Sequence, residues 1–291
     1  MKNLIKKSLK ATVLASVLAA SFSSFSNTVW EIKKGEDVVH IGGTVHLLPI
    51  TEYPLPSVFT DTYQAADSIV LETKLPTPDD QAGQMAMLKA MAYADGETLS
   101  QHLSAQTNES LKQYFSAVGI EFEKLNKFKP GFISSMILNI ETQKAGMAGA
   151  GVDMYFSQLA NQDNKSIEYL ETLDFQINML ANMGVGNEEY AIKHNLAEAE
   201  EIVPLLKKLI KAWRVGDENA INELALVQMK EQFPSSFKAM MTDRNLDWVP
   251  KIEALFNDDD QEFVLVGAAH LVGEDSVIEQ LKDKGYKVTK L

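Results

Sequence analysis

One short pattern occurs twice in this chain, once near each end, and it constrains the fold more than any other feature. An apolar segment followed by Gly-x-x-His-Leu is found first in VVHIGGTVHLLP (38–49) and again in EFVLVGAAHLVGEDSV (262–277). Short apolar runs rich in valine and isoleucine are typical of buried strands. We therefore expect strands from opposite ends of the chain, each ending in the same glycine and histidine.

The other strand signals also lie mostly outside the middle of the chain. TVWEI (28–32) and the first repeated segment flank a glycine turn and predict a hairpin, while SIVLET (68–73), SIEYLET (166–172) and YKVTKL (286–291) predict further strands. Between about residues 81 and 256 apolar residues recur at helical spacing, with a kink or break expected at Pro204.

These patterns predict a fold of the α/β class with α+β character, because the sheet is mixed and many of the helices form a separate block. Strands from both chain ends form a mixed central sheet, and a large helical block inserted at about 81–256 flanks it. We expect a single domain over residues 27–291. The similarity of SIVLETKLP to SIEYLETLD, added to the repeated glycine and histidine, predicts internal pseudo-symmetry from a divergent duplication.

The first 26 residues have the composition of an export signal. Four lysines and no acid come first, an apolar run of about a dozen residues follows, and SSFSN (23–27) supplies small residues for signal peptidase. The apolar run is too short to cross a hydrocarbon layer of ~30 Å, although an uncleaved N-terminal anchor is the alternative. We expect a secreted or periplasmic mature protein.

Charge and composition exclude several classes of function. The chain has a net charge of −13, and loss of the four leader lysines would leave about −17. Such a surface repels nucleic acid and anionic lipid, so neither is an expected partner. The absence of cysteine excludes disulfides, thiolate metal sites and a cysteine nucleophile. After the leader, no apolar run is long enough to predict a membrane span.

Each histidine of the repeated pattern stands three residues after its glycine. Gly43 precedes His46, and Gly267 precedes His270. A glycine at a strand end permits a sharp bend and a close approach, so both glycines have a structural role. In open α/β sheets the loops beyond the carboxyl ends of the strands line the ligand crevice. If the two strands are neighbours, His46 and His270 meet there; the alternative is two unrelated loop histidines.

Two glutamates can join the histidines. Glu72 and Glu171 each stand at the end of their own predicted strand. Two imidazoles with one or two carboxylates form a ligand set suited to a divalent transition metal with open positions for water and substrate. Such a metal lowers the pKa of bound water, and a spare carboxylate can accept its proton during hydrolysis.

Three further polar residues are candidates for a role. Arg244 and Asn245 lie close together in TDRNLDWVPKI (242–252), shortly before the second histidine strand. Arg244 can orient a carboxylate ligand or bind a substrate carbonyl or carboxylate; the alternative is a surface salt bridge. Asp153, in GAGVDMYF, is adequately explained as a helix N-cap.

Several segments together resemble the TraB/GumN family, which includes the TIKI-type metalloproteases and is similar to the erythromycin-esterase and ChaN-like folds. They are IGGTVHLLP, ADSIVLET, GVDMYF, YLETLDFQ, DRNLDW and FVLVGAAHLVGEDSVIEQLKDKGYKV. The resemblance covers about residues 29–291 and implies a mixed sheet with internal pseudo-symmetry and a metal site at the paired Gly-x-x-His elements. In TIKI-type members the activity is metal-dependent peptide cleavage, with manganese or cobalt implicated. The matching positions are Gly43 and His46, Gly267 and His270, Glu72, Glu171, Arg244 and Asn245.

The combined prediction is an exported metal-dependent hydrolase, most simply a peptidase, acting on a peptide or small-molecule substrate. A divalent metal (manganese, cobalt or zinc) is held by His46 and His270 with Glu72 or Glu171, and the other glutamate acts as general base. Arg244, with Asn245, steadies the substrate or the developing oxyanion. The alternatives are a non-catalytic periplasmic binder of haem, metal, a small ligand or a peptide, and a protein that sequesters a peptide signal.

Overall fold

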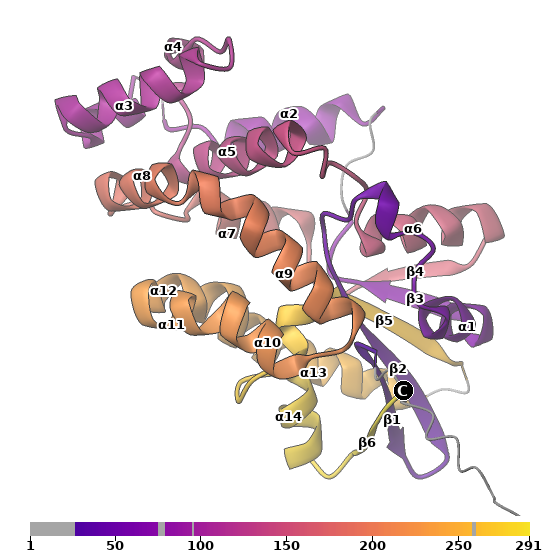
Figure 1. Ribbon diagram of the computed structural model, residues 1–291. Helices are drawn as coiled ribbons and strands as arrows, with labels where there is room; N and C mark the ends of the chain where they lie inside the picture. The colour runs from indigo at the N-terminus through magenta and orange to yellow at the C-terminus, as the bar shows by residue number, and fades with distance from the viewer. Residues whose placement is uncertain (1–26, 75–78, 95, 258–259) are drawn as a thin grey trace, which may run out of the picture.

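The computed structural model describes residues 27–74, 79–94, 96–257 and 260–291 (Figure 1). The expected signal peptide, residues 1–26, lies outside this part of the chain. The strands form one six-stranded sheet in the order β4-β3-β5-β2-β1-β6. Their bounds are β1 Val29–Lys34, β2 Asp37–Thr44, β3 Ser68–Leu71, β4 Ser166–Tyr169, β5 Glu262–Gly267 and β6 Lys287–Lys290.

The sheet joins the two ends of the chain, as the repeated pattern predicts. β1 and β2 form the expected antiparallel hairpin, and β2 pairs in parallel with β5, with Thr44 opposite Gly267. β5 pairs in parallel with β3, and β3 with β4. Four neighbouring strands therefore run in one direction and end at one edge of the sheet. The predicted mixed sheet is confirmed, while the predicted duplication stays a prediction.

The chain closes with a strand–helix–strand unit. β5 leads through α14 (Val277–Asp283) to β6, which pairs with β1 at the far edge of the sheet. Because β6 and β2 are both antiparallel to β1, β6 runs in the same direction as β5, although two strands separate them. Ser276 caps α14 by accepting a hydrogen bond from the backbone N–H of Glu279, which fixes where the helix begins.

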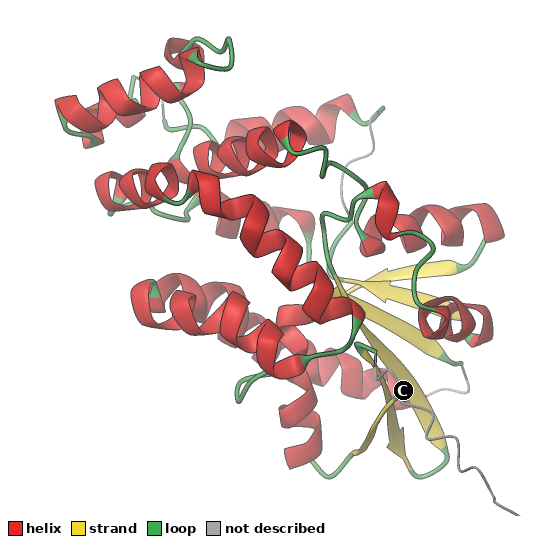
Figure 2. Cartoon of the chain, in the orientation of Figure 1, coloured by secondary structure: helices red, strands yellow, loops and turns green. Residues whose placement is uncertain are grey.

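Helices cover both faces of the sheet (Figure 2). One face packs against α1 (Ser57–Ala65), α6 (Val152–Asp163) and α9 (Ile202–Arg214), where Phe59, Phe156 and Trp213 are fully buried. The other face packs against α13 (Asp243–Ala254) and α14. Alternate residues of each strand face opposite layers, so the sheet contributes side chains to two cores.

The middle of the chain builds a helical block with a core of its own. Its break is at the predicted place, because one helix ends at Ala197 and the next begins at Ile202, two residues before Pro204. Among the described residues no helix is long and apolar enough to cross a membrane. The block and its connections contain α2 Gln81–Ala90, α3 Ala105–Ser116, α4 Phe122–Leu125, α5 Pro130–Lys144, α7 Leu173–Ala181, α8 Glu188–Ala197, α10 Glu218–Asn222, α11 Gln228–Gln232 and α12 Pro234–Phe237.

Short 3-10 and π-helical segments link several of these helices. Two segments are π-helical, and the second runs directly into α13. A π turn leaves the regular backbone ladder and is often found at functional sites. The π segments are η4 Glu223–Val227 and η5 Lys238–Thr242, and the 3-10 segments are η1 Ile50–Glu52, η2 Leu99–His102, η3 Ala199–Glu201, η6 Leu255–Asn257 and η7 Ala268–Leu271.

Candidate active site

The four parallel strands bring the predicted side chains to one edge of the sheet. Each strand is followed within three residues by a histidine or a glutamate: His46 after β2, Glu72 after β3, Glu171 after β4 and His270 after β5. The pairing of β3 and β4 continues past their ends, because the backbone N–H of Glu171 donates to the carbonyl of Glu72 at 2.8 Å. Parallel pairing is thus the physical reason that these four residues converge.

Gly267 lies at the centre of this convergence. A Cβ atom placed on Gly267 would be 3.3 Å from Glu72 Oε1, 3.6 Å from His46 Nε2 and 3.6 Å from His270 Cδ2. His46 Nε2 and His270 Cδ2 are therefore separated by at most the sum of these two 3.6 Å distances. The paired Gly-x-x-His elements lie at one place, and the missing side chain of Gly267 lets His46, Glu72 and His270 approach one another closely.

The first glycine of the pair, Gly43, has a different local role. A Cβ on Gly43 would lie 3.0 Å from the Cα and Cβ of Ala268, closer than side chains normally pack. Its carbonyl accepts a hydrogen bond from Trp213 Nε1 at 2.6 Å. Gly43 therefore lets the loop after β5 pack directly on β2, and this close approach brings the two histidine loops together.

On the buried side of the site, Arg244 contacts both glutamates and His270. The guanidinium donates to Glu171 (Nε to Oε2 3.1 Å, Nη2 to Oε1 2.8 Å), to Glu72 Oε2 at 2.6 Å, to His270 Nε2 at 3.0 Å and to the Met240 carbonyl at 3.3 Å. A guanidinium has five N–H donors, and these five contacts use them all. Arg244 is 4% exposed, so the alternative of a surface salt bridge is wrong.

His270 is held as a neutral ring between two fixed partners. Because Arg244 can only donate, His270 Nε2 accepts and the ring proton is on Nδ1, 2.6 Å from Asn245 Oδ1. The Asn245 amide in turn donates to the Asp275 carbonyl at 2.7 Å. Burial, together with the charge of Arg244, lowers the pKa of His270 to about 3, although the Glu72 carboxylate opposes this. The role of Asn245 in this structure is to orient His270.

His46 faces the same space from the opposite side and is far more exposed, with 61% of its side chain accessible. Its Nδ1 lies 3.3 Å from Asp153 Oδ2. Desolvation lowers the pKa of His46, but the hydrogen bond with Asp153 and the negative charges of Glu72 and Asp153 outweigh it and raise the pKa to about 9, against the opposing charge of Arg244.

The structure corrects the interpretation of Asp153. Gly151, not Asp153, is the N-cap of α6, and Asp153 lies in the first turn with its carboxylate toward His46. An aspartate at the start of a predicted helix is most often the N-cap, so the sequence pattern favours that role for Asp153. Only the fold, which places the start of α6 beside the loop after β2, reveals the contact: the backbone N–H of Val152 donates to the Val45 carbonyl at 3.0 Å.

Glu72 is the carboxylate shared by both sides of the site. Desolvation raises its pKa, but His46, Arg244 and His270 and a 2.7 Å hydrogen bond from the Gly267 backbone N–H together lower it to about 2. Glu171 is buried and is fixed from three directions. In addition to Arg244, it accepts from Trp248 Nε1 at 3.1 Å and from Gln176 Nε2 at 3.1 Å.

Three buried oxygen atoms near this edge have no hydrogen-bond partner among the described residues. They are Thr44 Oγ1 at the end of β2, Thr73 Oγ1 next to Glu72, and Asp153 Oδ1. Buried polar groups are nearly always satisfied by protein, water or ligand. Thr44, opposite Gly267 in the register, and Thr73, next to Glu72, thus each carry a buried hydroxyl with no partner among the described residues.

The donor atoms in this arrangement do not fit a divalent metal ion. Glu171, Glu72 Oε2 and His270 Nε2 all point at the guanidinium of Arg244, and a metal would need the same lone pairs. Among the described residues no group of three or more histidine, aspartate or glutamate side chains is placed to hold one. The predicted metal centre of His46, His270, Glu72 and Glu171 therefore stays a prediction that requires Arg244 to move.

Comparison with known proteins places the chain among relatives of similar length. The YbaP proteins of Escherichia coli and Shigella flexneri, both described as uncharacterized, are each 25% identical to it over 248 residues, which is 84% of this chain and 87% of theirs. No solved structure shows significant similarity. The model of the TraB/PrgY/gumN family matches residues 28–290, which spans the whole sheet and every residue of the candidate site. The chain therefore belongs to the TraB/PrgY/gumN family.

Proposed function

We propose that the protein is an exported hydrolase that cleaves peptides or small molecules at an amide or ester bond. The observation that carries this proposal is the convergence of His46 Nε2 and Glu72 Oε1 around Gly267, 3.6 Å and 3.3 Å from the position of a Cβ on that residue. One is the tip of a solvent-facing imidazole and the other is a buried carboxylate. A proton donor and a proton acceptor on either side of one small space are the groups that hydrolysis needs.

The pKa values assign the two roles. At neutral pH His46 carries a proton on Nε2, because its pKa is raised to about 9, and Glu72 is ionised, because its pKa is lowered to about 2. His46 can then give a proton to the leaving group while Glu72 Oε1 takes one from the attacking water. The ion pairs that lower the pKa of Glu72 also make it a weak base, so slow turnover is expected.

The developing oxyanion needs donors other than Arg244. All five N–H groups of Arg244 are engaged, so this residue acts by holding Glu72, Glu171 and His270 in place. We propose that the hydroxyls of Thr44 and Thr73, which are buried and have no partner among the described residues, serve as these donors once the site opens to a substrate oxygen. The engaged donors favour the first of the two roles expected for Arg244, orienting a carboxylate, over the second, binding a substrate carbonyl or carboxylate.

Activity and its pH dependence test the proposal. The chain from residue 27 onward is incubated with a mixture of peptides and simple esters, and products are identified by mass spectrometry. We expect His46→Gln to lower the rate by about 10²–10⁴-fold and the exposed control His102→Gln to leave it unchanged. The rate should be flat at neutral pH and fall above about pH 9 as His46 loses its proton. Equal rates for both variants would overturn the proposal.

Metal dependence is tested in the same assay. Chelator-treated protein is compared with protein supplied with manganese, cobalt or zinc, and metal binding is measured alongside. Activity that survives chelation supports the acid–base pair of His46 and Glu72. Activity restored only by a metal, with one equivalent bound in the wild type and none in His270→Ala, would instead support the predicted metal centre and would require Arg244 to leave the carboxylates.

Export is part of the proposal and rests on the composition of residues 1–26. Expression of the full chain in a bacterium, followed by fractionation, tests it. We expect the mature form in the periplasm or medium, with an N-terminus near Asn27. Retention of the full-length chain in the cytoplasm would contradict it.

A further inference from the structure

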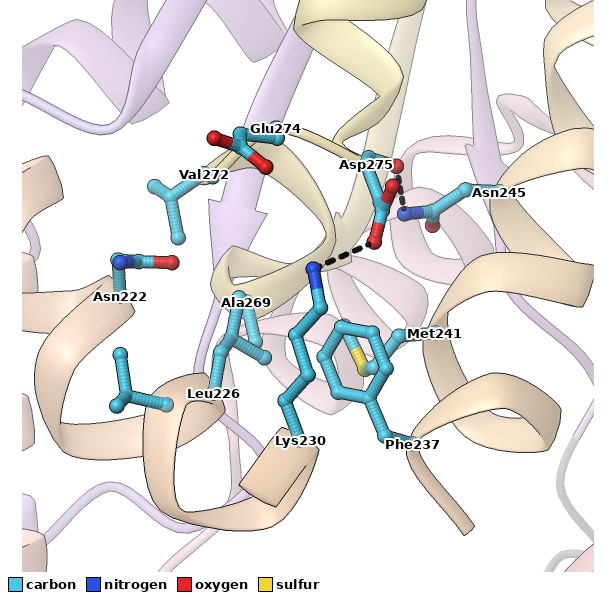
Figure 3. A pocket seen from close by; sticks show the side chains of 12 residues that line it. Asn222, Leu226, Lys230, Phe237, Met241, Asn245, Ala269, Val272, Glu274 and Asp275 are labelled. Carbon is cyan, nitrogen blue, oxygen red and sulfur yellow. Dashed lines mark hydrogen bonds and ion pairs between the residues drawn. The ribbon is translucent and has the colours of Figure 1, made fainter. Parts of the chain in front are cut away.

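A cavity lies next to the candidate site and is lined in part by Asn245 and Ala269. It has a volume of about 210 Å³, and its floor is formed by the apolar side chains of Leu226, Phe237, Met241 and Val272 (Figure 3). All four are at least nine-tenths buried. A cavity of about 150 Å³ lined by similar side chains is large enough to bind benzene. This one can therefore hold an apolar group of the size of a leucine or phenylalanine side chain.

The rim of the cavity is polar and its charge is unbalanced. Lys230 extends past the ring of Phe237 and pairs with Asp275 Oδ2 at 3.3 Å (Figure 3). Glu274, also on the rim, is exposed and forms no ion pair with any described residue. The three side chains carry a net charge of −1, and the whole chain is strongly acidic. The rim therefore favours a cation beside an apolar body.

The backbone around the cavity departs from regular helix and turn geometry. Leu226 and Met241 come from the two π-helical segments η4 and η5, which face each other across the floor. Gly273 has a φ of +82°, and a Cβ there would lie 2.6 Å from Asn222 Oδ1. The left-handed glycine turn thus lets the loop that carries Glu274 approach α10, and the rim closes around the cavity on that side.

One wall of the cavity is Asn245, the residue that orients His270. Asn245 is 2% exposed, and its side chain joins His270 to the Asp275 carbonyl. The cavity is therefore distinct from the space at Gly267 but shares a wall with the candidate active site.

We propose that this cavity is a binding site for an apolar group that carries a primary ammonium ion. The apolar part lies against Leu226, Phe237 and Met241, and the ammonium group pairs with Glu274 on the rim. Two sources have this chemistry, namely the N-terminal residue of a peptide and a free small amine. The proposal does not depend on hydrolysis at His46.

Binding of four small probes tests the proposal without an activity assay. Leucinamide has both the apolar group and the ammonium ion, glycinamide lacks the first and N-acetylleucinamide lacks the second. A tripeptide amide that begins with leucine separates the two sources. Calorimetry or ligand-observed NMR gives the affinities. We expect glycinamide to bind at least about tenfold more weakly than leucinamide, and N-acetylleucinamide about three- to fivefold more weakly.

Two variants place the binding in this cavity. Val227→Phe introduces a ring at a half-buried position of the lining, and Glu274→Gln removes the charge at an exposed position where folding is not at risk. The matched controls are Val185→Phe and Glu200→Gln, at exposed positions elsewhere. We expect Val227→Phe to weaken leucinamide binding at least tenfold, Glu274→Gln to weaken it three- to fivefold, and both controls to match the wild type.

Each outcome decides the matter. Equal affinity for glycinamide and leucinamide, no measurable binding of leucinamide, or wild-type affinity in both Val227→Phe and Glu274→Gln would overturn the proposal. If the pattern holds and the tripeptide binds as tightly as leucinamide or more tightly, the natural ligand is a peptide N-terminus. If the pattern holds and the tripeptide binds much more weakly, the ligand is a free small amine. A failure here would leave the hydrolase proposal intact, because no step at His46 uses this cavity.

Discussion

The two Gly-x-x-His elements have the same sequence pattern and opposite surroundings. His46 is exposed, pairs with a carboxylate and has a pKa raised to about 9. His270 is buried, contacts an arginine and an amide, and has a pKa lowered to about 3. One ring is a cation that can exchange its proton with solvent, and the other is a neutral ring fixed in place.

The neighbouring residues, and not the motif, determine the protonation state and the contacts of each histidine. The loop after β2 opens toward the start of α6, which supplies Asp153. The loop after β5 lies beneath α13, which supplies Arg244 and Asn245. A repeated motif therefore brings two imidazoles together without making them equivalent, and a symmetric pair of metal ligands is only one of the arrangements that it permits.

The largest effect should come from removing Arg244, on the buried side of the comparison. Arg244→Leu would leave the carboxylates of Glu72 and Glu171 buried without their cation. Breaking a buried ion pair in this way costs about 3–5 kcal/mol. We expect a loss of that size in the free energy of unfolding, measured with urea, and failure to fold in the more severe case. Arg214→Leu, at a partly exposed arginine, is the control and should cost far less.

A near-native stability for Arg244→Leu would show that the two glutamates are not held as described. The additional change Glu171→Gln in the same chain should recover part of the loss, since it removes one of the uncompensated charges.

The two motif glycines offer a sharper comparison. Gly267→Ala places a methyl group 3.3 Å from Glu72 Oε1 and 3.6 Å from His46 Nε2, where it occupies the reaction space. Gly43→Ala places one 3.0 Å from the backbone of Ala268, so the chain must shift. We expect Gly43→Ala to lower the free energy of unfolding by about 1–3 kcal/mol and Gly267→Ala to change it by less than about 1 kcal/mol. Activity should fall in both variants.

The reverse order of stabilities, or full activity in Gly267→Ala, would mean that the substrate does not bind beside Gly267. Gly96→Ala is a poor control because its φ is positive. Ala94→Gly, in a loop outside the candidate site, is a better control. It measures how much an exchange between glycine and alanine changes the free energy of unfolding and the activity when no site residue is involved.

The smallest effect is the pH dependence of stability, in which the two histidines act in opposite directions. His270 has a folded-state pKa below its unfolded value of 6.5, so its contribution is complete above pH 6.5 and is lost as the pH falls toward 3. His46 has a raised pKa, so its contribution is complete below pH 6.5 and is lost as the pH rises through about 9. Stability should therefore be highest near pH 6.5–7.

Urea unfolding between pH 9 and pH 5 measures this dependence. Between pH 7 and 5 we expect a loss of roughly 1–2 kcal/mol in the wild type and a smaller loss in His270→Gln. The decline above pH 7 should be absent in His46→Gln. Identical pH profiles for the wild type and both variants would contradict the assigned pKa shifts.

Much of this arrangement follows from local sequence, and the rest depends on packing between distant segments. The strand patterns predict β2, β3, β4 and β5 and place a histidine or glutamate at the end of each, because period and strand length are local properties. The four strands run in parallel in the order β4-β3-β5-β2, and their carboxyl ends share one edge of the sheet. Helical crossover connections set this order, and no local sequence pattern encodes it.

The contacts that distinguish the histidines were beyond the reach of pattern alone. From the sequence, Asp153 is expected to be a helix N-cap, and Asn245 is expected to contact the substrate together with Arg244. In the fold Asp153 contacts His46, and Asn245 turns to His270. The sequence predicts Arg244 as a partner for carboxylates, but only the structure shows that all five of its donors are used.

The most direct test of this account is an NMR titration of the histidine rings, with the signals assigned from His46→Gln and His270→Gln. We expect the His46 ring to titrate near pH 9 and this value to drop in Asp153→Asn. We expect the His270 ring to stay neutral, with its proton on Nδ1, down to at least pH 5. Titration of both rings near pH 6.5, or protonation of His270 before His46 as the pH falls, would contradict it.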